Sequence, residues 1–148
     1  MTKICTTIEQ CKKLLDLGID INTADLTVTN YPLKDGSRFD FICCKLPNDT
    51  FPSITDGKSE KIPAWSLSAL LDLMPANLPL YPEATEEGVK EGKYRSSDLI
   101  ASTEGYLRKR YDGLYQYRYD RIKTVGDYDN PIDAAFEMVV WLKENGKI

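Results

Sequence analysis

Apolar positions recur at helical spacing in three segments of the chain, which predicts three helices. The first is expected over about 7–17. Thr7 and Gln10 have the spacing of a capping box, in which each side chain satisfies a backbone N–H of the other residue. Gly18 follows at the position where many helices end in a left-handed conformation. Local capping chemistry therefore fixes both ends of this helix.

The central stretch Ile62–Pro75 is bounded by prolines and predicts a short buried helix. Ser66 is the expected N-cap. Trp65 before it and Leu70 after it have the spacing of a hydrophobic staple, in which an apolar residue outside the helix packs on one in the first turn. A staple explains the tryptophan without a partner.

The last helix is expected over about 131–145 and should be the longest. Asn130 is its predicted N-cap, Pro131 occupies the first helical position, and Asp133 meets the positive end of the helix dipole. Gly146 is placed to end it. Its apolar stripe predicts that it packs across a sheet.

Strands are predicted over 26–31 and 38–46, where β-branched and aromatic residues are enriched. The second of these is expected near the centre of a sheet. The segment 47–61 should be a polar loop and 76–93 a solvated acidic connector, because both are rich in breakers and charges. A further short strand is indicated at 99–103.

The clearest strand signal is a tyrosine- and arginine-rich hairpin over 106–121. Asp112-Gly113 is typical of a two-residue type I′ turn, which would pair Arg110 with Tyr115. That register predicts a shared face that forms a candidate binding surface. Its members are Tyr106, Arg108, Arg110, Tyr115, Tyr117, Tyr119 and Arg121.

Together these elements predict an α+β fold. A single domain over residues 1–148 is expected, with a mostly antiparallel sheet of about four to five strands packed against three helices. Alternatively, the sheet could leave its hairpin edge open for pairing, which would make a homodimer.

Composition argues against most enzyme classes, because the chain contains no histidine. The commonest general base and transition-metal ligand is therefore missing, together with every imidazole-dependent triad. No phosphate-binding glycine loop occurs either, so no cofactor is expected. An enzyme that uses carboxylates is a remaining alternative, but the pattern of acidic residues identifies no catalytic pair.

The four cysteines, Cys5, Cys11, Cys43 and Cys44, lack a Cys-x-x-Cys spacing and are expected to be reduced, mostly packing residues. The N-terminus has no continuous apolar segment of the secretory type, and no apolar run approaches the length of a membrane span. These features predict a cytoplasmic protein that has no contact with a membrane.

The hairpin face offers a second functional hypothesis, the binding of single-stranded nucleic acid. Tyrosine rings can stack on bases, and six basic side chains over 106–123 face only two carboxylates. The other interpretation is a half-buried sheet face, with tyrosines on the last helix and arginines reaching solvent. The acidic balance of the whole chain, a net charge of −4, favours this packing interpretation.

Three segments have distinctive amino-acid sequences, which include IPAWSLSALLDLMP and NPIDAAFEMVVWLKENG. These segments are 7–26, 62–75 and 130–148. In these segments the chain resembles short uncharacterised proteins of gut bacteria, their prophages and mobile elements. The hairpin followed by a helix is also similar in layout to small antitoxins of the HicB type. The resemblance implies a prophage or mobile-element context and no mechanism. The absence of catalytic motifs and the acidic composition favour a non-enzymatic accessory protein that binds an unidentified protein partner.

Overall fold

The computed structural model describes residues 3–44 and 60–148, in which α-helices and antiparallel strands confirm the α+β class. The α-helices are α1 (Ile8–Asp16), α2 (Leu67–Leu73), α3 (Glu86–Lys90) and α4 (Pro131–Glu144), and the 3₁₀-helices are η1 (Ile21–Thr23) and η2 (Ser96–Leu99). The strands are β1 (Leu26–Pro32), β2 (Arg38–Cys44), β3 (Glu60–Ala64), β4 (Asn77–Pro79), β5 (Ser102–Lys109), β6 (Tyr115–Tyr119) and β7 (Lys123–Tyr128).

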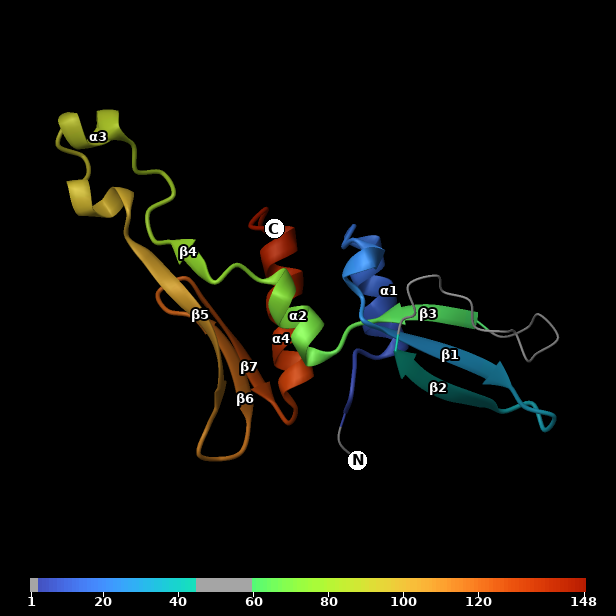
Figure 1. The fold of residues 1–148 in the computed structure, drawn as a ribbon. Helices are drawn as coiled ribbons and strands as arrows, with labels where there is room; N and C mark the ends of the chain where they lie inside the picture. Colours follow the sequence, from blue (N-terminus) through green and yellow to red (C-terminus); the bar gives the residue numbers. More distant parts are fainter. Residues whose placement is uncertain (1–2, 45–59) are drawn as a thin grey trace.

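The strands form two sheets, which corrects the expectation of one. The first has the order β2-β1-β3 and the second the order β4-β5-β6-β7, and all pairs are antiparallel. Figure 1 shows the two sheets on opposite sides of the molecule, with α2 and α4 between them. Which distant strands pair depends on tertiary contacts, and the pattern of single strands does not specify these.

The three predicted helices are confirmed together with their caps. Thr7 and Gln10 form the capping box of α1. The Ser66 hydroxyl accepts a hydrogen bond from the Ala69 N–H and caps α2. The Asn130 side chain accepts from the Asp133 N–H and caps α4. Each of these starts depends on residues within four positions, which is why the sequence predicts them well.

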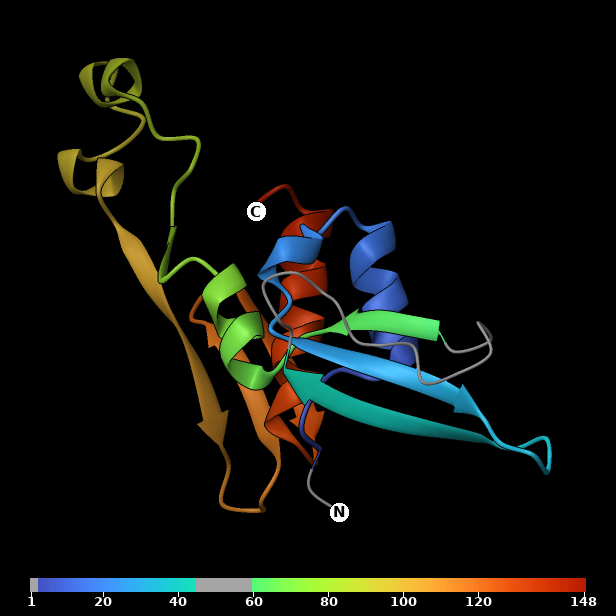
Figure 2. The same ribbon diagram turned by 45° about the vertical axis from the view of Figure 1, so that its right-hand side comes forward.

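One hydrophobic core joins both sheets and three of the helices. Figure 2 shows α1, α2 and α4 gathered between the sheets. The residues that are fully excluded from solvent come from all of these elements. They include Cys11, Leu14, Ala64, Trp65, Leu70, Tyr119, Ala135, Met138, Val139 and Leu142.

A polar cluster fastens the N-terminal segment to the start of α4. The Asp133 carboxylate forms an ion pair with Lys3 and accepts hydrogen bonds from Gln10 and Asn130. Partial burial alone would raise the pKa of this carboxyl. The bonds from these three partners outweigh the burial and hold the pKa below its ordinary value. The ionised form of Asp133 therefore stabilises the fold.

Replacing Asp133 by asparagine should lower the free energy of unfolding by about 1.5–2 kcal/mol at pH 7, the lower end of the range for hydrogen bonds to a charged group, because Asp133 is partly exposed. Because the folded-state pKa is depressed, the contribution is complete above about pH 5 and disappears as the pH falls through the folded-state pKa. Urea unfolding at pH 7 and pH 3 measures this. Asp72→Asn, on the exposed side of α2, is the control and should have little effect at either pH. An equal loss at both pH values would contradict the assignment.

Three segments differ from their predictions. The strand expected at the centre of a sheet is β2, which lies at an edge and is exposed over Arg38–Ile42. The acidic connector contains β4 and α3. The strand expected at 99–103 begins at Ser102, after η2. The loop predicted over 47–61 falls outside the described residues, except that positions 60 and 61 begin β3.

Candidate functional site

The hairpin of β5 and β6 closes through a three-residue loop, and the predicted two-residue turn is wrong. The Arg110 carbonyl accepts from the Gly113 N–H at 3.0 Å, and the Arg110 N–H donates to the Leu114 carbonyl at 2.7 Å. Gly113 has a φ of 86°, and Asp112 accepts from the Leu114 N–H at 3.1 Å. This pattern is that of a three-residue loop, a type I turn followed by a left-handed glycine. A second loop of the same kind, at Asp35-Gly36, closes the β1–β2 hairpin.

The longer loop shifts the strand register by one residue. Lys109 pairs with Tyr115, and Leu107 pairs with Tyr117. In the predicted register these tyrosines faced Arg110 and Arg108. Because side chains alternate along a strand, a one-residue shift exchanges the two faces of β6 relative to β5. The predicted face that joined the arginines to the tyrosines is therefore wrong.

Tyr115, Tyr117 and Tyr119 share the face of β6 that packs toward α4. Tyr117 is 5% exposed and Tyr119 is fully buried, with ring centroids 5.7 Å apart. The Tyr119 hydroxyl donates to the Pro75 carbonyl at 2.5 Å. Burial raises the pKa of both hydroxyls. These two rings belong to the core and cannot stack on a base without unfolding the sheet.

The opposite face of the hairpin carries Tyr106, Arg108 and Arg118. One carboxylate, that of Asp120, lies beside two of these groups. Arg118 forms an ion pair with Asp120 at 3.1 Å, and the Tyr106 hydroxyl lies 3.3 Å from the same carboxylate. This face is therefore not a continuous basic surface with rings between its cations.

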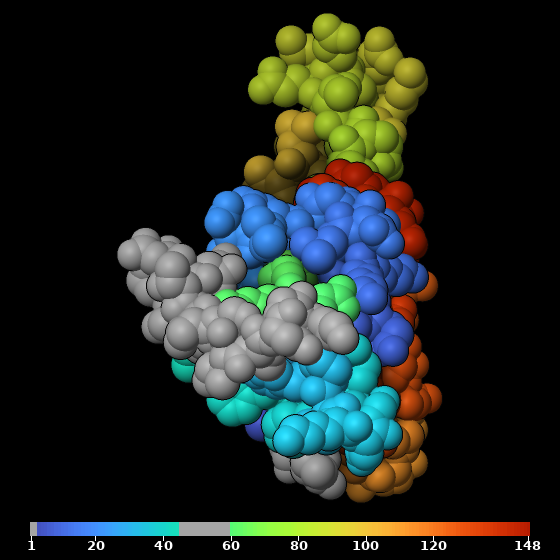
Figure 3. Space-filling view, turned by 90° about the vertical axis from the view of Figure 1, so that its right-hand side faces the viewer, coloured from blue at the N-terminus to red at the C-terminus, as the bar shows by residue number. Residues whose placement is uncertain are grey.

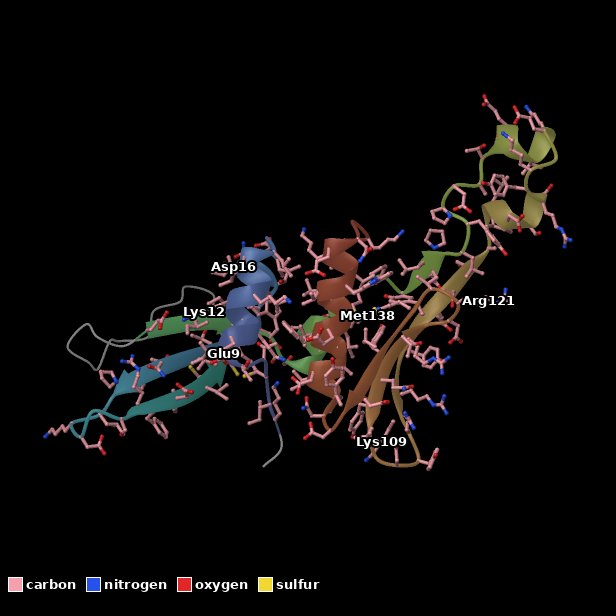
Figure 4. The ribbon with its side chains drawn as sticks, turned by 180° about the vertical axis from the view of Figure 1, so that it is seen from behind. Glu9, Lys12, Asp16, Lys109, Arg121 and Met138 are labelled. Carbon is pink, nitrogen blue, oxygen red and sulfur yellow. The ribbon has the colours of Figure 1, made fainter. Side chains whose placement is uncertain are left out.

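The remaining cations of the hairpin lie at its two ends. Arg110, at the loop, is held by Asp127 at 2.7 Å and by Asp112 at 3.0 Å. Arg121 is exposed in the turn between β6 and β7, at the other end of β6. Figure 4 shows Arg121 well separated from Lys109 near the loop. The seven predicted residues are thus divided among the core, the outer face and two turns.

Two of the four cysteines are packing residues, as predicted. Cys5 and Cys11 are buried, and burial raises the pKa of the Cys5 thiol to about 11 and also raises that of Cys11. None of the four forms a disulfide bond. A groove of about 450 Å³ lies beside Cys5 and includes Ile42 of β2, and a thiol with this pKa stays protonated there at neutral pH.

Within the described ranges, no group of three or more acidic, cysteine or histidine side chains could hold a metal ion. In the same residues, no helix has the length and apolar character that would let it cross a bilayer.

The surface that the sequence did not predict is an ordered projection over residues 80–101, called the arm below. Figure 1 shows α3 and η2 at the far end of β5, away from the other helices, and Figure 3 shows them standing clear of the body. The arm begins and ends side by side, because the Leu80 N–H donates to the Ala101 carbonyl at 2.9 Å. The apolar residues next to this junction of Leu80 and Ala101 in the chain, Tyr81, Leu99 and Ile100, are exposed.

The arm has its own internal order. Thr85 caps α3 by accepting from the Gly88 N–H at 3.0 Å, and the Lys93 N–H closes the helix on the Gly88 carbonyl at 2.9 Å. A Cβ at Gly88 would lie 2.7 Å from a ring carbon of Tyr94, so glycine lets that ring pack directly on α3. Glu83, Glu86, Glu87 and Glu91 are exposed around this unit.

Comparisons of the chain with protein-family models, with curated proteins and with solved structures each gave no match. Function is therefore argued from the geometry of these surfaces.

Proposed function

We propose that the protein is a non-enzymatic accessory protein of the cytoplasm that binds another protein through its arm. The carrying observation is the exposure of Ile100, which is 84% accessible on an arm held by regular hydrogen bonds. Tyr81 and Leu99 beside it are 39% and 40% exposed. A cluster of exposed apolar residues on an ordered projection is typical of a protein-binding surface.

The arm makes little contribution to the stability of the body. Of the described residues, the hydrophobic core includes none from 80–101. The bonds that order the arm are mostly internal to it. The core therefore does not require an ordered arm. A role in binding would explain why the arm is ordered.

Charge defines the kind of partner. The exposed glutamates of the arm, Glu83, Glu86, Glu87 and Glu91, slightly outnumber its exposed cations, Lys90, Lys93 and Arg95. Glu91 forms an ion pair with Lys93 at 3.1 Å. Complementary potentials guide association and exclude wrong partners. We therefore infer that the partner presents an apolar pocket with a small excess of lysine or arginine side chains around it. An accessory role of the prophage or mobile-element kind is consistent with such a small adaptor.

Replacing Ile100 by aspartate should weaken partner binding at least about 30-fold, because buried apolar anchors at interfaces commonly contribute about 2 kcal/mol or more. The free energy of unfolding should change by less than about 0.5 kcal/mol, since Ile100 is exposed. A photo-crosslinking amino acid at position 100, in lysate of the source cells, identifies the partner. Titration of the purified partner with the wild type and with Ile100→Asp then measures the loss of affinity.

The matched control is Tyr111→Ser at the hairpin loop, because Tyr111 is 97% exposed but lies outside the arm. Tyr111→Ser should bind the partner with unchanged affinity. A cross-linker at position 111 should not capture the protein that is captured from position 100. Equal capture at positions 100 and 111 would contradict the proposal. Binding of single-stranded nucleic acid that Arg108→Ala abolishes and Ile100→Asp does not would favour the hairpin hypothesis instead.

A further inference from the structure

The first sheet has two different edges. Along the β1–β2 ladder the Leu33 N–H donates to the Ser37 carbonyl, so the alternating pairs Tyr31–Phe39 and Thr29–Phe41 also exchange hydrogen bonds. The even-numbered residues of β2 therefore direct their N–H and C=O groups to the outer side. In the described part of the chain, no strand pairs with that side.

The other edge, on β3, carries a protecting residue. Pro63 lies opposite Thr27, and by the same alternation this pair exchanges no hydrogen bonds, so the Pro63 nitrogen faces outward. A proline there has no N–H to offer to another strand. Natural sheets protect exposed edges in this way. The edge at β2 contains no proline and carries exposed aromatic residues, because Phe39 is 54% and Phe41 47% accessible.

We propose that two copies of the chain associate through β2, which pairs antiparallel with its equivalent around a two-fold axis at Phe39. The occupant of the edge is therefore a second copy of this chain. An antiparallel edge is self-complementary under two-fold symmetry. The proposal does not depend on the arm.

Charge selects this register. Outward-directed residues must face each other, so the axis lies at a residue of β2. Centring on Arg38 would place two guanidinium groups opposite each other, and centring on Ile42 would place Asp40 against a cysteine. Centring on Asp40 would place two carboxylates opposite each other. Centring on Phe41 would place Asp40 against an isoleucine. Centring on Phe39 places Arg38 opposite Asp40 of the partner subunit, and does so twice, which is the favourable arrangement of cross-strand charges.

The resulting assembly brings exposed aromatic residues of the two copies together on one face of the joined sheet. Phe39 and Phe41 lie on one face of β2. The axis places Phe39 opposite its equivalent, and Phe41 lies diagonally beside Phe39 of the partner subunit. Arg38 and Asp40 lie on the other face, where the Asn30 side chain bridges them within each subunit. The two three-stranded sheets would become one sheet of six strands.

Analytical ultracentrifugation of the full chain tests the proposal. The wild type should dimerise, and Arg38→Asp and Asp40→Arg should each raise the dissociation constant about tenfold or more, because two attractive pairs become repulsive. An equimolar mixture of the two variants should form a heterodimer, since opposite charges again face each other. The double variant that carries both substitutions should regain dimerisation.

Lys12→Asp on the exposed side of α1, labelled in Figure 4, is the charge-matched control and should dimerise like the wild type. Thermal unfolding of each variant verifies that the fold is kept, as expected for exposed positions. A monomeric wild type at all concentrations would overturn the proposal. So would a dimer that both single substitutions leave unchanged. Because Ile100→Asp should still dimerise, failure here is distinguishable from failure of the arm hypothesis.

Discussion

Replacement of Trp65 by alanine should lower the free energy of unfolding by about 3–5 kcal/mol, the range for a buried aromatic side chain. Trp65 is fully buried, and its indole N–H donates to the Thr23 hydroxyl at 2.9 Å. Its backbone carbonyl accepts from the Thr6 N–H at 3.0 Å, and its backbone N–H donates to the Thr6 hydroxyl at 3.1 Å. The residue therefore joins the N-terminal segment, η1 and α2.

A loss of this size is a large part of the total stability of an ordinary domain, about 5–15 kcal/mol. Urea unfolding followed by circular dichroism measures it without relying on tryptophan fluorescence. The control is Trp141→Ala, because Trp141 is only half-buried on α4 and its ring lies 6.0 Å from the Lys123 ammonium. That variant should lose about 1–2 kcal/mol. An equal or larger loss at Trp141 would contradict the central place of Trp65 in the core.

Local chemistry made the helices predictable. The capping box at Thr7, the serine before α2 and the Asn-Pro pair before α4 all act within one helical turn. The sequence also placed Trp65 and Leu70 inward, and both are fully buried. In each case the deciding interactions lie between residues a few positions apart, so one sequence is sufficient to reveal them.

Strand placement was less predictable, because it depends on distant partners. The run of apolar residues from Phe41 to Cys44 is typical of a buried strand, yet β2 lies at an edge. The same limit applies to the hairpin loop. Asp112-Gly113 fits two kinds of loop, and the choice between them sets which face each tyrosine occupies. An Asp-Gly pair alone does not distinguish them.

The arm was missed for a physical reason as well. Its glutamates and Pro82 are typical of a solvated connector, and α3 is only five residues long. Its order depends on the Tyr94 ring against Gly88 and on the junction of Leu80 with Ala101. Contacts between residues that lie six or more positions apart in an irregular segment leave no periodic pattern. The candidate binding surface therefore emerged only from the structure.

Replacing Gly105 by alanine should lower the free energy of unfolding by about 1–3 kcal/mol, the cost of forcing an extra carbon into a packed site. A Cβ at Gly105 would lie 2.4 Å from one ring carbon of Tyr119 and 2.6 Å from another. The ring cannot move aside easily, because it is fully buried and its hydroxyl is bonded to the Pro75 carbonyl. Without this contact, alanine would stabilise the strand relative to glycine. A decrease in the free energy of unfolding therefore identifies the clash.

Urea unfolding of a double-mutant cycle with Tyr119→Leu isolates the contact. The alanine substitution should cost much less in the leucine background, with a coupling energy of about 1 kcal/mol or more. The result also tests the strand register, because Gly105 lies opposite Tyr119 only when the hairpin has a three-residue loop. In the register of a two-residue turn, Tyr106 would lie opposite Tyr119, and Gly105→Ala would be neutral or stabilising. Such a result would contradict the burial of the tyrosines, and with it the division of the predicted hairpin surface.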